Sequence, residues 1–301
     1  MKQSLTYYLT LWVIKLKGLK EKFSQDPIDY KAIRKEDVYE PKGKFFKKHI
    51  TNKFQILNTS ITEIGLNDSN KLILFIHGGA FISGPGKHHW DSIKSIAQRT
   101  DYTIWLCNYP KAPEFHISEI SENIDAIFMK ATELFEPKNI TLLGDSVGGT
   151  LITSLVQRLV QEEWPLPKKL LLISPVMDAS FTNPDIDKID SVDPMISKKG
   201  LLSAKKMCAK DYHLKDPIIS PIYGSFEGFP ETILYAAEKD ITYPDQVLAY
   251  KKAKKANVDI KLIKGENMPH IWPFLPIMKE SQVALKKLID KLNQNKQQTI
   301  D

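Results

Sequence analysis

A serine on a glycine-flanked turn is the strongest chemical signal in the sequence. Ser146 lies in the segment Gly144-Asp-Ser-Val-Gly148, directly after the apolar run 140–143 and directly before a helical pattern that extends to about residue 163. This G-x-S-x-G pattern is typical of a strand–turn–helix elbow that exposes a serine hydroxyl for nucleophilic attack. The glycine spacings of phosphate-binding loops do not occur here. The sequence therefore predicts a nucleophile at Ser146.

A second glycine-containing segment, His77-Gly-Gly-Ala-Phe81, directly follows the apolar run 71–76. Acyl transfer needs preorganised N–H donors at the point where the carbonyl oxygen becomes negative. Glycines can turn their amides towards one point, and the amide of the residue after the nucleophile usually joins them. We therefore predict an oxyanion hole formed by the amides of Gly78, Gly79 and Val147.

A nucleophilic serine also needs a histidine base and a carboxylate, which follow it along the chain in the order acid, then histidine. His213 and His270 are the two histidines after Ser146, and His270 follows the strand pattern 259–263 by a short loop. His213 lies in a region without strands. Asp240, just after the strand pattern 232–237, is the favoured acid, and the alternatives are Asp178 and Asp245.

Apolar runs that alternate with helical patterns must position these residues. Such alternation predicts an α/β fold with a mainly parallel central sheet and helices on both faces. The expected strands are 54–58, 61–64, 71–76, 103–108, 140–143, 169–173, 232–237 and 259–263. The expected helices are 89–99, 117–135, 147–163, 245–256 and 278–293.

Two segments have no place in this sheet and predict a helical cap. Residues 4–23 form one amphipathic helical pattern, and residues 185–215 form another within the long interval between two strands. We expect residues 1–45 to be an N-terminal cap segment, and residues 46–295 a catalytic domain with a cap insertion at about 180–215. The apolar residues expected to line a substrate pocket are Leu11, Trp12, Leu16, Ile196, Leu201, Leu202 and Met207.

With these motifs the chain resembles the hormone-sensitive-lipase family of α/β-hydrolases over roughly residues 70–290. The matching segments are 77–81, 108–114, 144–149, 237–240 and 269–270. The resemblance implies the α/β-hydrolase fold with a cap, carboxylesterase activity, and Ser146, Asp240 and His270 as nucleophile, acid and base. Two positions differ from the family pattern: Ala80 replaces a third glycine, and Ile241 follows Asp240 where the family has proline.

Composition and charge exclude several other classes of protein. Two cysteines are too few for a disulfide scaffold, and no cluster of metal ligands is apparent, so we expect neither metal nor cofactor. Residues 1–50 carry 12 basic and 6 acidic side chains, whereas the rest carries 30 of each. A neutral body argues against nucleic-acid binding. The uncharged run 5–14 is shorter than the roughly 18 apolar residues that span a bilayer, and we expect a cytoplasmic protein.

These observations favour a serine carboxylesterase that hydrolyses short- to medium-chain acyl esters through an acyl-enzyme intermediate. An amidase or deacetylase could use the same triad. A lipase at a membrane surface could use the N-terminal helix, whose lysines suit peripheral contact. A non-catalytic ligand-binding protein on the same fold and a homo-oligomer also remain open.

Overall fold

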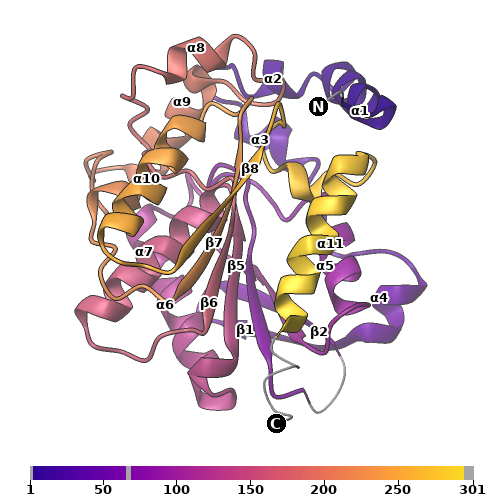
Figure 1. Ribbon diagram of the computed structural model, residues 1–301, viewed down its shortest axis with the longest axis vertical. Helices are drawn as coiled ribbons and strands as arrows, with labels where there is room; N and C mark the ends of the chain where they lie inside the picture. Colours follow the sequence, from indigo (N-terminus) through magenta and orange to yellow (C-terminus); the bar gives the residue numbers. More distant parts are fainter. Residues whose placement is uncertain (1–2, 66–68, 295–301) are drawn as a thin grey trace.

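The computed structural model describes residues 3–65 and 69–294, and its centre is one eight-stranded sheet (Figure 1). The strand order is β1-β2-β4-β3-β5-β6-β7-β8, with β1 and β2 antiparallel to their neighbours and the others parallel. The predicted α/β fold class is thus confirmed. The strands are β1 (Ile50–Ile56), β2 (Thr59–Ile64), β3 (Leu72–Ile76), β4 (Thr103–Asn108), β5 (Ile140–Asp145), β6 (Lys169–Ile173), β7 (Glu231–Ala237) and β8 (Ile260–Gly265).

The central strands are buried on both sides, which is why they appear in the sequence as continuous apolar runs. Every residue of β3, β5 and β6 is buried. Strand β1 begins four residues before its predicted start, because its exposed polar residues Thr51, Asn52 and Lys53 carry no apolar signal. An edge strand with a solvated face is thus the one whose limits the sequence predicts least well.

Helices cover both faces of the sheet (Figure 1). One face carries α5 (Lys87–Ala97) and α11 (Lys279–Asn293), and the other carries α6 (Ile117–Leu134), α7 (Val147–Gln161) and α10 (Tyr243–Lys255). The short helix α4 (Lys44–His49), which the sequence analysis does not predict, precedes β1. No helix within residues 3–65 and 69–294 is long and apolar enough to cross a membrane.

The N-terminal segment and the 185–215 insertion form a cap beyond the carboxyl ends of the parallel strands, at the top of Figure 1. They contribute α1 (Leu5–Leu16), α2 (Leu19–Lys22), α3 (Tyr30–Arg34), α8 (Ile186–Asp190) and α9 (Lys198–Ala209). Direct hydrogen bonds join the two parts: Lys20 Nζ donates to the Asp193 carbonyl at 2.7 Å, and the Ile28 amide donates to Ser203 Oγ at 3.0 Å.

The single N-terminal helix predicted over residues 4–23 is wrong, because it is broken at Gly18, which adopts a left-handed φ of +58°. Such a conformation suits glycine and ends a helix. The predicted cap segment begins at residue 1 and the predicted catalytic domain ends at residue 295. Residues 1–2 and 295 lie outside the described part of the chain.

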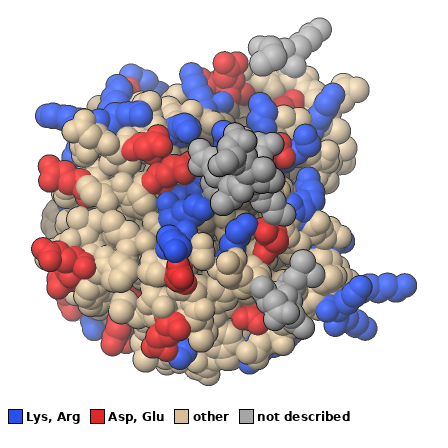
Figure 2. Space-filling model, turned by 60° about the horizontal axis from the view of Figure 1, so that its bottom comes forward, with Lys and Arg blue, Asp and Glu red and all other residues tan. Residues whose placement is uncertain are grey.

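The face opposite the cap carries charges of both signs (Figure 2). Lysine and arginine side chains alternate there with aspartate and glutamate. This mixture reflects the neutral net charge of residues 51–301. A nucleic-acid enzyme would instead concentrate basic side chains in one stripe.

Candidate active site

Ser146 occupies the predicted elbow between β5 and α7. Its backbone has φ 50° and ψ −123°, a strained conformation for a residue other than glycine. A side chain at Gly148 would collide with the carbonyl oxygen of Ile76 on the neighbouring strand, so the turn can pack closely only with glycine there. Strain that the surrounding packing maintains is typical of functional positions. The elbow places Ser146 on the wall of a cavity that His270 also lines.

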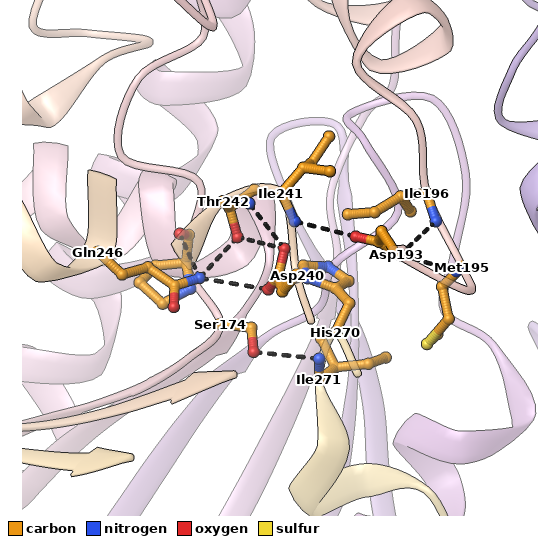
Figure 3. Close-up of polar contacts among 11 residues, drawn as sticks. Ser174, Asp193, Met195, Ile196, Asp240, Ile241, Thr242, Gln246, His270 and Ile271 are labelled. Carbon is orange, nitrogen blue, oxygen red and sulfur yellow. Dashed lines mark hydrogen bonds and ion pairs between the residues drawn. The ribbon is translucent and has the colours of Figure 1, made fainter. Parts of the chain in front are cut away.

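His270 meets Asp240 through a short hydrogen bond, with 2.7 Å between His270 Nδ1 and Asp240 Oδ2 (Figure 3). Asp240 is fully buried and held from its other side by Thr242, whose amide and hydroxyl donate to Oδ1 at 2.8 and 2.7 Å. Gln246 Nε2 donates to Oδ2 at 3.4 Å. These bonds fix the carboxylate against the imidazole and leave His270 Nε2 for other chemistry.

The two alternative acids have other partners. Asp178 accepts hydrogen bonds from Ser180 and Tyr223, and Asp245 accepts one from Asn183. Among the three aspartates considered from the sequence, Asp240 is therefore the one that the fold brings to His270.

The electrostatics of His270 suit a base. Burial by itself would lower its pKa, but the charge of Asp240 and the hydrogen bond to it outweigh burial, so the pKa of His270 is raised above 6.5. The loop that carries the imidazole is also fixed, because the Ile271 amide donates to Ser174 Oγ at 3.1 Å. Ile271 itself adopts a left-handed φ of 48°.

Asp193, in the insertion, is a residue that the sequence analysis missed. Its Oδ2 accepts the Ile241 amide at 2.9 Å, and its Oδ1 accepts the amides of Met195 and Ile196 (Figure 3). Burial and the nearby charge of Asp240 raise the pKa of Asp193. Asp193 thus ties the cap to the loop of the acid. The Asp193-Pro194 pair marks a turn in the sequence, but its partner at Ile241 is distant along the chain.

The predicted oxyanion hole needs one correction. The Gly78 amide donates to Asp145 Oδ1 at 3.0 Å, so it is not free for a substrate oxygen. The amides of Gly79 and Ala80 have no backbone or side-chain acceptor in the described part of the chain. Gly79 can turn this way because its φ is +126°. With Val147 at the start of α7, whose amide lacks an intrahelical partner, the available donors are Gly79, Ala80 and Val147.

Asp145 lines the cavity and also braces this loop through its hydrogen bonds. It is buried and receives His89 Nε2 at 3.2 Å as well as the Gly78 amide. Burial would raise its pKa, but His89 outweighs burial and the pKa of Asp145 is lowered. His88, beside it on the cavity wall, has its pKa lowered to about 3 by burial. It is therefore a neutral side chain at physiological pH.

His88, His89 and Asp145 also form a cluster whose ligand atoms lie within 4.8 Å of one another, a spacing compatible with a metal ion. This cluster is not among the sites predicted from the sequence. Both ring nitrogens of His89 already have partners, because Nδ1 accepts the Gly86 amide at 2.8 Å and Nε2 bonds to Asp145. A metal ion would have to break the contact that braces the oxyanion loop, so the residues fit such an ion poorly.

The cavity has a volume of about 440 Å³ and a mainly apolar wall. Ile196 and Leu201 line it as predicted, whereas five other predicted residues do not: Leu11, Trp12, Leu16, Leu202 and Met207. Helix α1 instead faces the cavity with Thr10, Val13 and Ile14, and Lys17 directly after the helix also lines it. Because α1 is apolar on nearly all sides, its periodicity could not indicate which face turns inward.

Comparison with known proteins agrees with this geometry. Residues 73–274 match the α/β-hydrolase fold family. An esterase of Acinetobacter venetianus is 32% identical over 204 residues, which cover 65% of this chain and 66% of that protein. A triacylglycerol lipase of Mycobacterium tuberculosis is 26% identical, and the match covers 69% of this chain and only 43% of the lipase.

Solved structures show the same fold. A Staphylococcus aureus protein aligns with a TM-score of 0.79 at 29% identity, covering 88% of this chain and 90% of that one. An esterase described as a member of the bacterial hormone-sensitive lipase family aligns with a TM-score of 0.84 at 22% identity. The alignment covers 98% of this chain and 99% of that one. The resemblance to α/β-hydrolases read from the motifs is confirmed, and the chain belongs to the α/β-hydrolase fold family.

Proposed function

We propose that the protein is a serine carboxylesterase with Ser146 as nucleophile, His270 as base and Asp240 as acid. The observation that carries the proposal is that Ser146 and His270 line one cavity while Asp240 bonds His270 Nδ1 at 2.7 Å. A relative from Pseudomonas putida, 25% identical, is named an ethyl acetate hydrolase, which agrees with an ester substrate.

The reaction would begin with attack of Ser146 Oγ on the ester carbonyl carbon. His270 Nε2 would take the serine proton and return it to the leaving alcohol as the acyl-enzyme forms. Asp240 would keep the imidazole in the correct tautomer and stabilise its charged form. The amides of Gly79, Ala80 and Val147 would stabilise the oxyanion. Water activated by His270 would then release the acid and regenerate the serine.

The cavity supports short- to medium-chain acyl groups. Its volume of about 440 Å³ lies at the low end for ligand pockets, and Ile14, Ile196 and Leu201 supply apolar wall. Each buried methylene adds about 0.8 kcal/mol only while there is space for it. We expect acyl chains of about two to eight carbons to be preferred, with activity rising with acyl length and then falling for longer chains. In this proposal residues 1–45 and about 180–215 form the cap that encloses the cavity of the catalytic domain, residues 46–295.

A panel of p-nitrophenyl esters with acyl chains of increasing length tests the proposal, with the matching p-nitroanilides for amide hydrolysis. The expected result is ester hydrolysis by the wild type and none above background by Ser146→Ala. Faster hydrolysis of anilides than of esters would favour the amidase alternative. One relative, from Homo sapiens, is named arylacetamide deacetylase-like 4, which agrees with that alternative. Activity that survives in Ser146→Ala would reject the assignment of the nucleophile.

A further inference from the structure

The outer face of helix α1 is an exposed apolar stripe. Its five residues have large exposed fractions: Leu5 88%, Tyr8 58%, Leu9 47%, Trp12 58% and Leu16 65%. They recur three or four positions apart along the helix and therefore share one face. Single exposed apolar residues are ordinary, but a contiguous set on one face indicates an interaction site. We name these five residues the α1 stripe.

The opposite face of α1 is firmly attached to the protein, so the α1 stripe points outward in the folded state. Tyr7 and Ile14 are buried, and the Tyr7 hydroxyl donates to the carbonyl of Asn267 at 2.9 Å. At the start of the helix, the amide and hydroxyl of Ser4 donate to the carboxylate of Glu280 at 2.7 and 2.8 Å. The helix cannot turn the stripe inward without breaking these contacts.

The charge that α1 itself carries is basic. Helix α1 contains no acidic residue, and Lys15 is exposed. With successive residues rotated by about 100°, Lys15 lies at the border of the stripe beside Tyr8. The exposed Lys17, directly after the helix, lies on the side of the cavity that it lines. The first 50 residues also hold the whole net positive charge of the chain. An apolar face with a lysine at its border fits an anionic lipid surface, where the apolar residues enter the interface and the lysine meets the headgroups.

A second copy of this chain fits the stripe less well. Self-association about a two-fold axis would place each copy of the stripe against the same surface of its partner. Lys15 would then face a second copy of α1 that offers no acidic residue, so the two surfaces have no charge complementarity. The charge pattern therefore favours an anionic partner over self-association.

We propose that the α1 stripe docks the protein onto the surface of an anionic lipid bilayer, with α1 lying in the plane of the interface. The cavity is next to this contact. Thr10 and Val13 of α1 line the cavity, and the exposed lining residues at its mouth are Lys17, Glu36, Lys87, Pro276 and Ile277. In Figure 1 α1 lies at the edge of the cap beside α11. Docking would thus bring the cavity mouth close to the lipid surface.

Vesicle co-sedimentation of the full chain tests the proposal, with one set of vesicles of phosphatidylcholine alone and one that also contains phosphatidylglycerol. We expect the wild type to sediment with the anionic vesicles and to be released as salt rises, because salt screens the lysines. Leu5→Gln/Leu9→Gln should weaken this binding about tenfold or more. The matched control Leu134→Gln/Trp164→Gln removes exposed apolar side chains at the end of α6 and just after α7, outside the stripe, and should bind like the wild type.

Three results would overturn the proposal: no sedimentation of the wild type with anionic vesicles, equal binding by the stripe variant, or equal loss in the control variant. Size-exclusion chromatography without lipid provides a further test. A dimer that the stripe substitutions dissociate would show that a second copy covers the stripe. Thermal unfolding of each variant establishes that it is folded. The result does not depend on the proposed esterase activity, because Ser146→Ala should bind vesicles like the wild type.

Discussion

At the scale of single residues, Asp240, Asp178 and Asp245 are the three candidates for the acid. Each follows a buried strand or begins a helix, so only their contacts show which one can serve His270. Asp240→Asn keeps a side chain that can hold His270 but favours the wrong tautomer, so we expect turnover to fall by about 10⁴. Asp178→Asn is the matched control, since Asp178 contacts Ser180 and Tyr223 and should retain near wild-type turnover. Steady-state kinetics on a p-nitrophenyl ester measures both. The reverse ranking would reject Asp240 as the acid.

The pH profile tests the charges around His270. The imidazole acts as a base only when neutral, and its pKa is raised above 6.5, so kcat/KM should increase with pH through an apparent pKa above that value. The charge of Asp193 contributes to this raised pKa. Asp193→Asn should therefore move the profile to lower pH. If Asp193 only supports the fold, the substitution would lower activity and leave the midpoint of the profile unchanged.

At the scale of elements, the orientation of α1 is the clearest finding that periodicity could not supply. Val13 faces the cavity, whereas Leu9 lies on the exposed face of the same helix. Val13→Trp should fill part of the cavity and shift the preferred acyl chain to a shorter length. Leu9→Trp introduces the same side chain on the outer face and should leave the preference unchanged. A rate profile over p-nitrophenyl esters measures both variants, and equal shifts would contradict the orientation described here.

The elements also show what a sequence can and cannot predict. Buried parallel strands appear as unbroken apolar runs, so the sheet was predictable, as were Ser146 directly after β5 and Asp240 shortly after β7. The use of the Gly78 amide by Asp145 was not, because it depends on the distance between two loops that different strands carry. The bond of Asp193 to Ile241 joins residues 48 positions apart and leaves no local pattern.

At the scale of the whole molecule, the sheet carries the residues of the proposed active site and the cap encloses them. The cap is made from two parts that are distant in sequence, the N-terminal segment and the insertion, which meet through Lys20 and Ser203. One part also reaches the catalytic loops, since Asp193 bonds the residue after Asp240. Cavity shape and base position therefore depend on the same packed unit, and substitutions in the cap can change both.

The most direct test of the central claim is covalent labelling with a fluorophosphonate, which reacts with an activated serine hydroxyl. We predict that the wild-type protein is labelled at Ser146 alone, that Ser146→Ala is not labelled, and that His270→Ala is labelled far more slowly because the serine has lost its base. Mass spectrometry of the digested protein locates the adduct. Labelling that persists in Ser146→Ala, or an adduct at another residue of the wild type, would contradict the proposed active site.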